Sequence, residues 1–231
     1  MPMYFNENPL GLILLIGAIV IGFIASGHLQ RVYTQFSKVP TKRMMTGAET
    51  AAIISRRNGL DVQVERGQGV LTDHYDPRTG IIRLSPAVYD GTSVAAVSIA
   101  AHEMGHALQH HQGYAALNFR NALVPVVNIA SRMWMYVLLL GFIVGGAGNF
   151  MINAALIMFG LSFLFQLVTL PVEFNASNRA LAQLTDNGII GSEEAGGTKK
   201  VLGAAAMTYV AATLSSLAML VRILLVRDRR R

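Results

Sequence analysis

Long uncharged apolar segments are the feature that most restricts how this chain of 231 residues can fold. The first, PLGLILLIGAIVIGFIASG at residues 9–27, is about as long as one helix across a bilayer, at about 1.5 Å per residue. No lysine or arginine precedes it, as one would in a cleaved signal peptide, so we expect an uncleaved anchor. Hydrophobic residues make up 52% of the chain and charged residues 14%, which indicates a membrane protein.

Three further apolar segments lie in the C-terminal half of the chain. Residues 131–148 and 150–170 are each of spanning length and are joined by the turn sequence GGAGN, so they predict a helical hairpin that returns the chain to its starting side. Residues 201–226 are long enough for a fourth span, although a fourth crossing places the basic tail RDRRR outside. We prefer four spans; the alternative is that this last helix packs against the polar domain.

The segment between the first two spans, residues 28–123, is compatible with water. It carries many basic residues, whereas the residues before the first span carry none, and the positive-inside rule then places this domain in the cytoplasm. The net charge of +6 is explained by membrane orientation, and we expect no nucleic-acid partner. The chain is expected to be a multi-pass protein of the plasma membrane, with residues 171–200 on the same side as residues 28–123.

Local sequence patterns in the polar domain predict a small α+β fold. TGAETAAIISRRNGL is typical of a helix that ends at Gly59, and VQVERGQGV and GIIRLSP are typical of short strands, which we expect to form an antiparallel sheet. A second helix should begin near the DGTS sequence, where Thr92 or Ser93 can act as the N-cap.

The predicted second helix contains a metal-binding pattern, His-Glu-x-x-His, at residues 102–106. His102 and His106 are four residues apart and share one helix face, so both imidazoles can reach one Zn²⁺, while Glu103 can hold and deprotonate a water molecule. The chain has no cysteine, so the remaining ligands must be histidine or carboxylate. The alternative is a helix whose polar face merely carries histidines at the membrane surface.

The third metal ligand must come from elsewhere in the chain. His110 is excluded by reach, because three successive positions four residues apart cover about 12 Å of helix. The longer metzincin pattern would need Gly and His where the chain has Gln109 and Gln112. Among the downstream carboxylates, Glu173 is the best candidate, since it opens the helix EFNASNRALAQL; pairing with Arg179 or a surface lysine is its alternative role. The other carboxylates are Asp186, Glu193, Glu194 and Asp228.

At these residues the chain resembles the YugP-like membrane zinc metallopeptidases of bacteria and, more distantly, the HtpX-like membrane gluzincins. The likeness covers nearly the whole chain and includes LTDHYDPRTGIIRLS, AAHEMGHALQH, LPVEFNASNRAL and TYVAATLSS. It implies a gluzincin-type peptidase domain, with His102, His106 and Glu173 as zinc ligands and Glu103 as the catalytic residue. Gluzincins of the HtpX type have an aspartate four residues after the ligating glutamate, and here that position is Ser177.

The resemblance also implies how a substrate would bind. GIIRLS is expected to be an edge strand to which an extended peptide adds, and His74 or Tyr209 could stabilise the oxyanion. The chain is then expected to be a zinc-dependent endopeptidase with one Zn²⁺ per chain, the lipid bilayer as a partner and a peptide or membrane protein as substrate. The alternatives are a zinc-stapled membrane scaffold and an intramembrane protease of the site-2 kind.

Overall fold

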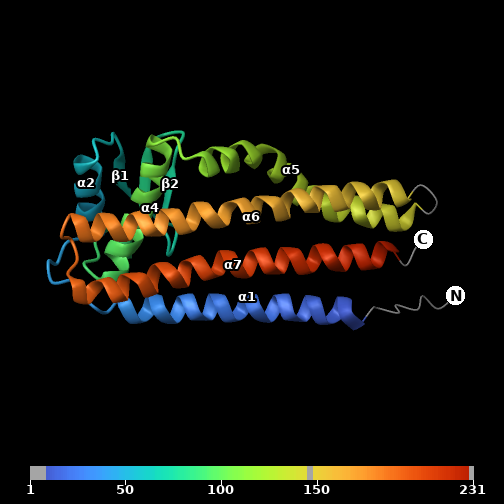
Figure 1. Cartoon of the computed structure of the whole chain (residues 1–231), viewed down its shortest axis with the longest axis horizontal. Helices are drawn as coiled ribbons and strands as arrows, with labels where there is room; N and C mark the ends of the chain where they lie inside the picture. The colour runs from blue at the N-terminus through green and yellow to red at the C-terminus, as the bar shows by residue number, and fades with distance from the viewer. Residues whose placement is uncertain (1–8, 145–147, 229–231) are drawn as a thin grey trace. The chain divides into compact units, whose positions relative to one another are not determined.

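The computed structural model describes residues 9–144 and 148–228, which form seven helices and three short strands (Figure 1). Residues 145–147 of the expected GGAGN turn and the last three residues of the basic tail lie outside the described part. The elements are α1 (Pro9–Phe36), α2 (Gly47–Arg57), β1 (Gln63–Arg66), β2 (His74–Asp76), β3 (Ile81–Leu84), α3 (Pro86–Tyr89), α4 (Val94–His111), α5 (Ala115–Ile143), α6 (Gly148–Asp186) and α7 (Ser192–Asp228).

The chain divides into two compact units. The first contains residues up to Ala25, Phe119–Leu170 and the residues from Tyr209 onward; the second contains Ser26–Asn118 and Pro171–Thr208. The long helices α1, α5, α6 and α7 each run from one unit into the other. In particular, α6 continues through Pro171, so the apolar segment at residues 150–170 and the segment that begins with Glu173 form a single helix.

The first unit consists of apolar helices. In the described residues, four helices are long and apolar enough to cross a membrane: Pro9–Phe36, Ala115–Ile143, Asn149–Asp186 and Ser192–Leu225. Large apolar side chains such as Phe23, Ile143 and Phe150 are exposed on them, as expected for a surface in contact with lipid. A smaller cluster is buried between helices, where the rings of Trp134 in α5 and Phe159 in α6 meet edge to face.

The second unit contains α2, which begins and ends as expected for its capping residues. Thr46 and Glu49 form a reciprocal capping box at its N-terminus, with Thr46 accepting from the Glu49 backbone N–H and Glu49 accepting from the Thr46 backbone N–H. The helix stops at Arg57, and Gly59 adopts the left-handed conformation that glycine tolerates, with φ of +61°. The predicted helix and its stop signal are confirmed.

The three strands form one small mixed sheet with the order β1-β3-β2. β1 and β3, the two strands predicted from the sequence, are parallel to each other and not antiparallel as expected, whereas β2 and β3 are antiparallel. The strand β2 was not predicted, because its three residues lie in a stretch dominated by turn signals. Since β3 pairs on both sides, the expectation that GIIRLS is an edge strand is wrong; the outer strands are β1 and β2.

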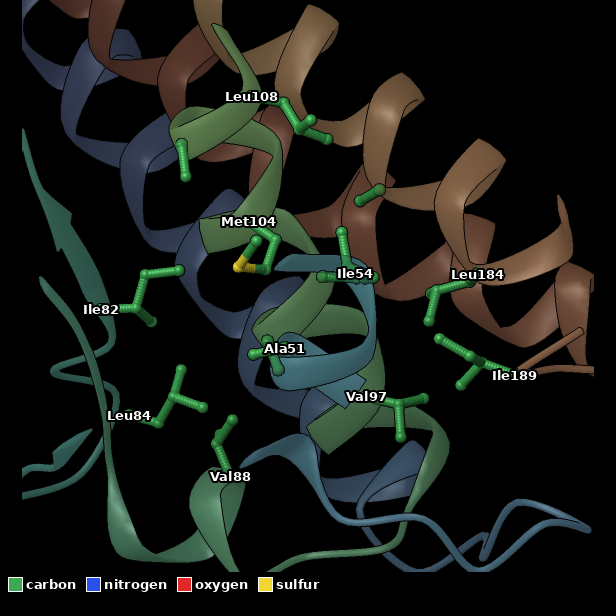
Figure 2. Close-up of a cluster of buried hydrophobic side chains, with 14 of the residues drawn as sticks. Ala51, Ile54, Ile82, Leu84, Val88, Val97, Met104, Leu108, Leu184 and Ile189 are labelled. Atoms are coloured by element: carbon green, nitrogen blue, oxygen red, sulfur yellow. The ribbon is translucent and has the colours of Figure 1, made fainter. Parts of the chain in front are cut away.

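The sheet and α2 pack on α4 through one hydrophobic core (Figure 2). Ile54 from α2, Ile82 and Leu84 from β3, Met104 from α4 and Leu184 from α6 are all fully buried in it. This core surrounds the apolar side of α4, so the opposite side of the helix is free to carry histidines. The core therefore holds α4 in a fixed orientation next to the Glu173 end of α6.

Candidate metal centre and active site

The helix α4 positions the two histidines of the His-Glu-x-x-His pattern. It begins where predicted, with the Ser93 side chain accepting a hydrogen bond from the Ala96 backbone N–H. His102 and His106 lie on successive turns of the helix, with ring centroids 4.8 Å apart and ring planes nearly perpendicular at 84°. The spacing of four residues therefore brings two imidazoles to one place.

The carboxylate of Glu173 meets these two imidazoles from α6. Its Oε2 atom lies 3.3 Å from His102 Nε2 and 3.7 Å from His106 Nε2. One ligand atom from each of the three residues lies within 4.8 Å of the others. Glu173 is only 3% exposed, and its Oε2 atom is buried without a hydrogen-bond partner. A buried carboxylate oxygen without a partner is costly, and a cation bound between these groups would compensate it.

The outward-facing nitrogens of both imidazoles have polar partners. His106 Nδ1 lies 3.0 Å from Gln109 Oε1, and His102 Nδ1 lies 3.3 Å from Ser177 Oγ. Histidines that bind metal commonly donate their second ring N–H in this way, which leaves the other nitrogen free as a ligand. Ser177 thus occupies the position of the aspartate in gluzincins of the HtpX type. Its contact with His102 is longer than the contact between Gln109 and His106.

The electrostatics of the cluster favour a positive charge. Burial by itself lowers the pKa of His106, but the Glu173 carboxylate close to its ring and the negative charge of Glu103 outweigh this effect, so the pKa of His106 is raised. Glu103, next to His102 on α4, is itself only 8% exposed. Two nearly buried carboxylates beside two imidazoles form a donor set that suits Zn²⁺, which binds nitrogen and oxygen ligands.

The other sequence candidates lie elsewhere. His110 bonds the hydroxyl of Tyr75 at 2.9 Å, and exposed His74 contacts the Thr72 carbonyl oxygen. Tyr209 lies in α7, at the boundary between the two compact units. Arg179, considered as an alternative partner of Glu173, donates its hydrogen bonds to Asn175 and Gln112.

Three of the remaining carboxylates lie where α6 ends and α7 begins. Glu193 forms an ion pair with Lys42, and Glu194 accepts from the backbone N–H groups of Lys42 and Gly191 at the start of α7. Asp186 is the last residue of α6. Within the described ranges, these three side chains are not in the group of potential metal ligands, which contains Glu173.

One residue close to the cluster was missed by sequence reasoning. Gln109 was considered only as a departure from the metzincin pattern, yet it is fully buried and hydrogen-bonds to His106. A usable signal was its position, because a polar residue three places after a ligand lies on the same side of the helix.

Comparison with known proteins agrees with these features. A family model described as "Putative neutral zinc metallopeptidase" matches residues 11–228. The chain is also similar to a Bacillus subtilis (strain 168) protein named "Putative membrane protease YugP", with 46% identity over 214 residues, which cover 92% of this chain and 94% of that protein. No solved structure matches the chain. Because the family model matches almost the full length of the chain and this relative is 46% identical to it, the chain belongs to the neutral zinc metallopeptidase family.

Proposed function

We propose that this protein is a membrane-anchored endopeptidase that depends on zinc. The observation that carries the proposal is the convergence of Glu173 from α6 with His102 and His106 from α4, with an unpartnered carboxylate oxygen between the two imidazoles. These three residues would hold one Zn²⁺ per chain. Bound zinc supplies a Lewis acid that polarises a peptide carbonyl and lowers the pKa of a water molecule.

Glu103 is proposed as the general base. In this role it accepts a proton from the attacking water and passes the proton to the nitrogen of the leaving amine. Its position supports the assignment, because the side chain is nearly buried and immediately follows the proposed ligand His102 on α4. His102 and His106 remain neutral ligands and take no proton in this scheme.

The outer strand β2 supports the proposed substrate class. β2 has β3 on one side only and packs against α4, the helix that carries the histidines. An extended peptide can pair with such a strand through its main chain, so β2 replaces β3 as the strand proposed to bind substrate. The bond from Tyr75 of β2 to His110 of α4 holds this strand beside the helix. Peptides or extended segments of membrane proteins are the proposed substrates.

The proposed location is the plasma membrane, with the zinc cluster on the cytoplasmic side. The four apolar helices support four crossings, and the basic residues of the segment at 28–123 support its location in the cytoplasm. The domain division proposed from the sequence, with spans at 9–27, 131–148 and 150–170 around a catalytic domain at 28–123, fits this topology. The C-terminal tail is then outside.

Two other functions are less well supported. A purely structural zinc site normally has four protein ligands, while the described residues bring together three. An intramembrane protease of the site-2 kind requires an aspartate ligand from a later span, whereas the carboxylate next to the histidines here is Glu173.

The decisive experiment compares the wild-type protein with Glu103→Gln, both purified in detergent. Zinc content is measured by elemental analysis, and cleavage of casein or a membrane-derived peptide is measured with and without a chelator. Glu103→Gln should keep its zinc and lose activity by several orders of magnitude. Glu65→Gln, an exposed glutamate that pairs with Arg83, is the matched control and should remain active. An active Glu103→Gln protein would refute the mechanism.

A further inference from the structure

Gln109 is a fully buried polar side chain that connects a proposed zinc ligand to the helix carrying another. Its Oε1 atom lies 3.0 Å from His106 Nδ1. Its Nε2 atom donates to two acceptors in α6, the Val172 carbonyl oxygen at 2.8 Å and Asn175 Oδ1 at 2.9 Å. These two acceptors flank Glu173 along the chain, so one side chain contacts α6 on both sides of the proposed ligand.

The orientation of the Gln109 amide is fixed by its partners in α6. The Val172 carbonyl can only accept, so it requires the amino group of Gln109 on that side. Asn175 Oδ1 also accepts from Arg179 Nε at 2.7 Å, and because arginine has no acceptor atom, this atom of Asn175 must be the oxygen. With its amino group directed to two acceptors, Gln109 turns its oxygen toward His106.

The protonation of His106 follows from that orientation. The Gln109 oxygen can only accept, so His106 must carry its proton on Nδ1 to make the hydrogen bond. The lone pair of the neutral imidazole is then on Nε2, the nitrogen that faces Glu173. Arg179, which is permanently charged, orients the Asn175 amide, and Asn175 in turn orients the Gln109 amide. The orientation of Gln109 then determines which nitrogen of His106 can bind a metal.

We propose that Gln109 is a positioning residue that fixes His106 as the tautomer able to bind zinc through Nε2, and that Asn175 and Arg179 hold Gln109 in the required orientation. The inference rests on the proposed function, since it concerns the same zinc site. It assigns to Gln109 the role that a carboxylate plays in many zinc sites, in which an acceptor behind the histidine orients the ring and raises its basicity.

The test uses zinc affinity of the purified apoprotein, measured by competition with a chromophoric chelator. Gln109→Met has nearly the same shape and no acceptor, and it should bind zinc about 10–100-fold more weakly. Gln112→Met is the matched control, because Gln112 is exposed and contacts Arg179 but not His106; it should bind zinc as the wild type does. Wild-type affinity in Gln109→Met would overturn the proposal.

A second variant separates positioning from a merely structural role. Gln109→Glu loses both donated hydrogen bonds to α6, as Gln109→Met does, but it keeps an acceptor for His106. It should therefore bind zinc much more tightly than Gln109→Met. Equal weakening in both variants would show that Gln109 only joins the helices. Gln112→Glu adds the same charge at the exposed control position; a gain over Gln112→Met as large as that of Gln109→Glu over Gln109→Met would attribute the rescue to charge alone.

A direct measurement covers the case in which the variants fail to fold. Histidine labelled with ¹³C and ¹⁵N is incorporated into the full-length protein, and the ring signals of His106 are assigned by comparison with His106→Ala. Zinc coordination through Nε2 with a proton on Nδ1 is expected, and coordination through Nδ1 would overturn the inference. Zinc retained in His106→Ala would instead contradict the proposed function, so the two failures are distinguishable.

Discussion

Gly105 of α4 lies directly against the backbone of Ala176 in α6, with no space between them for a side chain. A Cβ atom at position 105 would lie 2.5 Å from the Ala176 carbonyl oxygen and 3.1 Å from its Cα atom. Gly105 immediately precedes His106, and Ala176 follows Glu173 by three residues. This close approach of two helices is therefore what brings the histidines within reach of the carboxylate.

Replacement of Gly105 by alanine should disrupt the cluster. The added methyl group would meet backbone atoms, which cannot move aside as a flexible side chain can, so α4 and α6 must separate. We expect a loss of about 1–3 kcal/mol in stability, as for other overpacked sites, together with weaker zinc binding. Thermal unfolding and zinc titration measure the two effects.

The matched control for this variant is Gly196→Ala in α7, where nothing lies within 4 Å of the added Cβ. Because glycine destabilises a helix interior relative to alanine, this change should be neutral or stabilise the protein by up to about 1 kcal/mol. If Gly105→Ala behaved in the same way as Gly196→Ala, close packing at Gly105 would not be needed for the site.

Replacement of Glu173 by alanine should abolish stable zinc binding. The change removes the buried carboxylate that lies 3.3 Å from His102 Nε2 and 3.7 Å from His106 Nε2, and leaves two histidines alone. Zinc content after dialysis is the measurement. Glu193→Ala is the control, since Glu193 is an exposed partner of Lys42, and it should retain zinc. Full zinc occupancy in Glu173→Ala would eliminate Glu173 as a ligand.

Removal of the metal should lower the melting temperature of the wild-type protein. A ligand that binds only the folded state stabilises it by about 2.7 kcal/mol at a hundredfold excess over its Kd. A chelator should therefore lower the melting temperature, and added Zn²⁺ should restore it, as followed by differential scanning fluorimetry. The His102→Ala protein should show no such response; a zinc-dependent shift in this variant as large as in wild type would place the metal elsewhere.

The topology can be tested with single cysteines, because the natural chain contains none. A cysteine in place of exposed Arg57 in α2 should be protected from a membrane-impermeant maleimide in intact cells and react after permeabilisation. A cysteine added after the C-terminus should react in intact cells if α7 crosses the membrane. The cysteine-free protein is the background control. Labelling at position 57 in intact cells would reverse the proposed orientation.

Local patterns in the sequence were enough to predict several parts of the protein. The apolar segments indicate long membrane-compatible helices because length and composition alone decide that property. The spacing of His102 and His106 is set by the helical repeat, and Ser93 caps α4 through a contact only three residues long. Each of these features depends on neighbours in the chain, so the sequence by itself determined them.

Tertiary structure decided the features that depend on distant residues. β1 and β3 proved parallel, and β2 completed the sheet, because strand pairing is set by packing between segments that local patterns do not describe. Elimination of other carboxylates and the family resemblance predicted Glu173 as the third zinc ligand. Its distance from the histidines, however, depends on the close approach of Gly105 to Ala176. The role inferred for Gln109 arises from partners 63 and 66 residues away. Long-range contacts of this kind form only when the core has fixed the helices against one another.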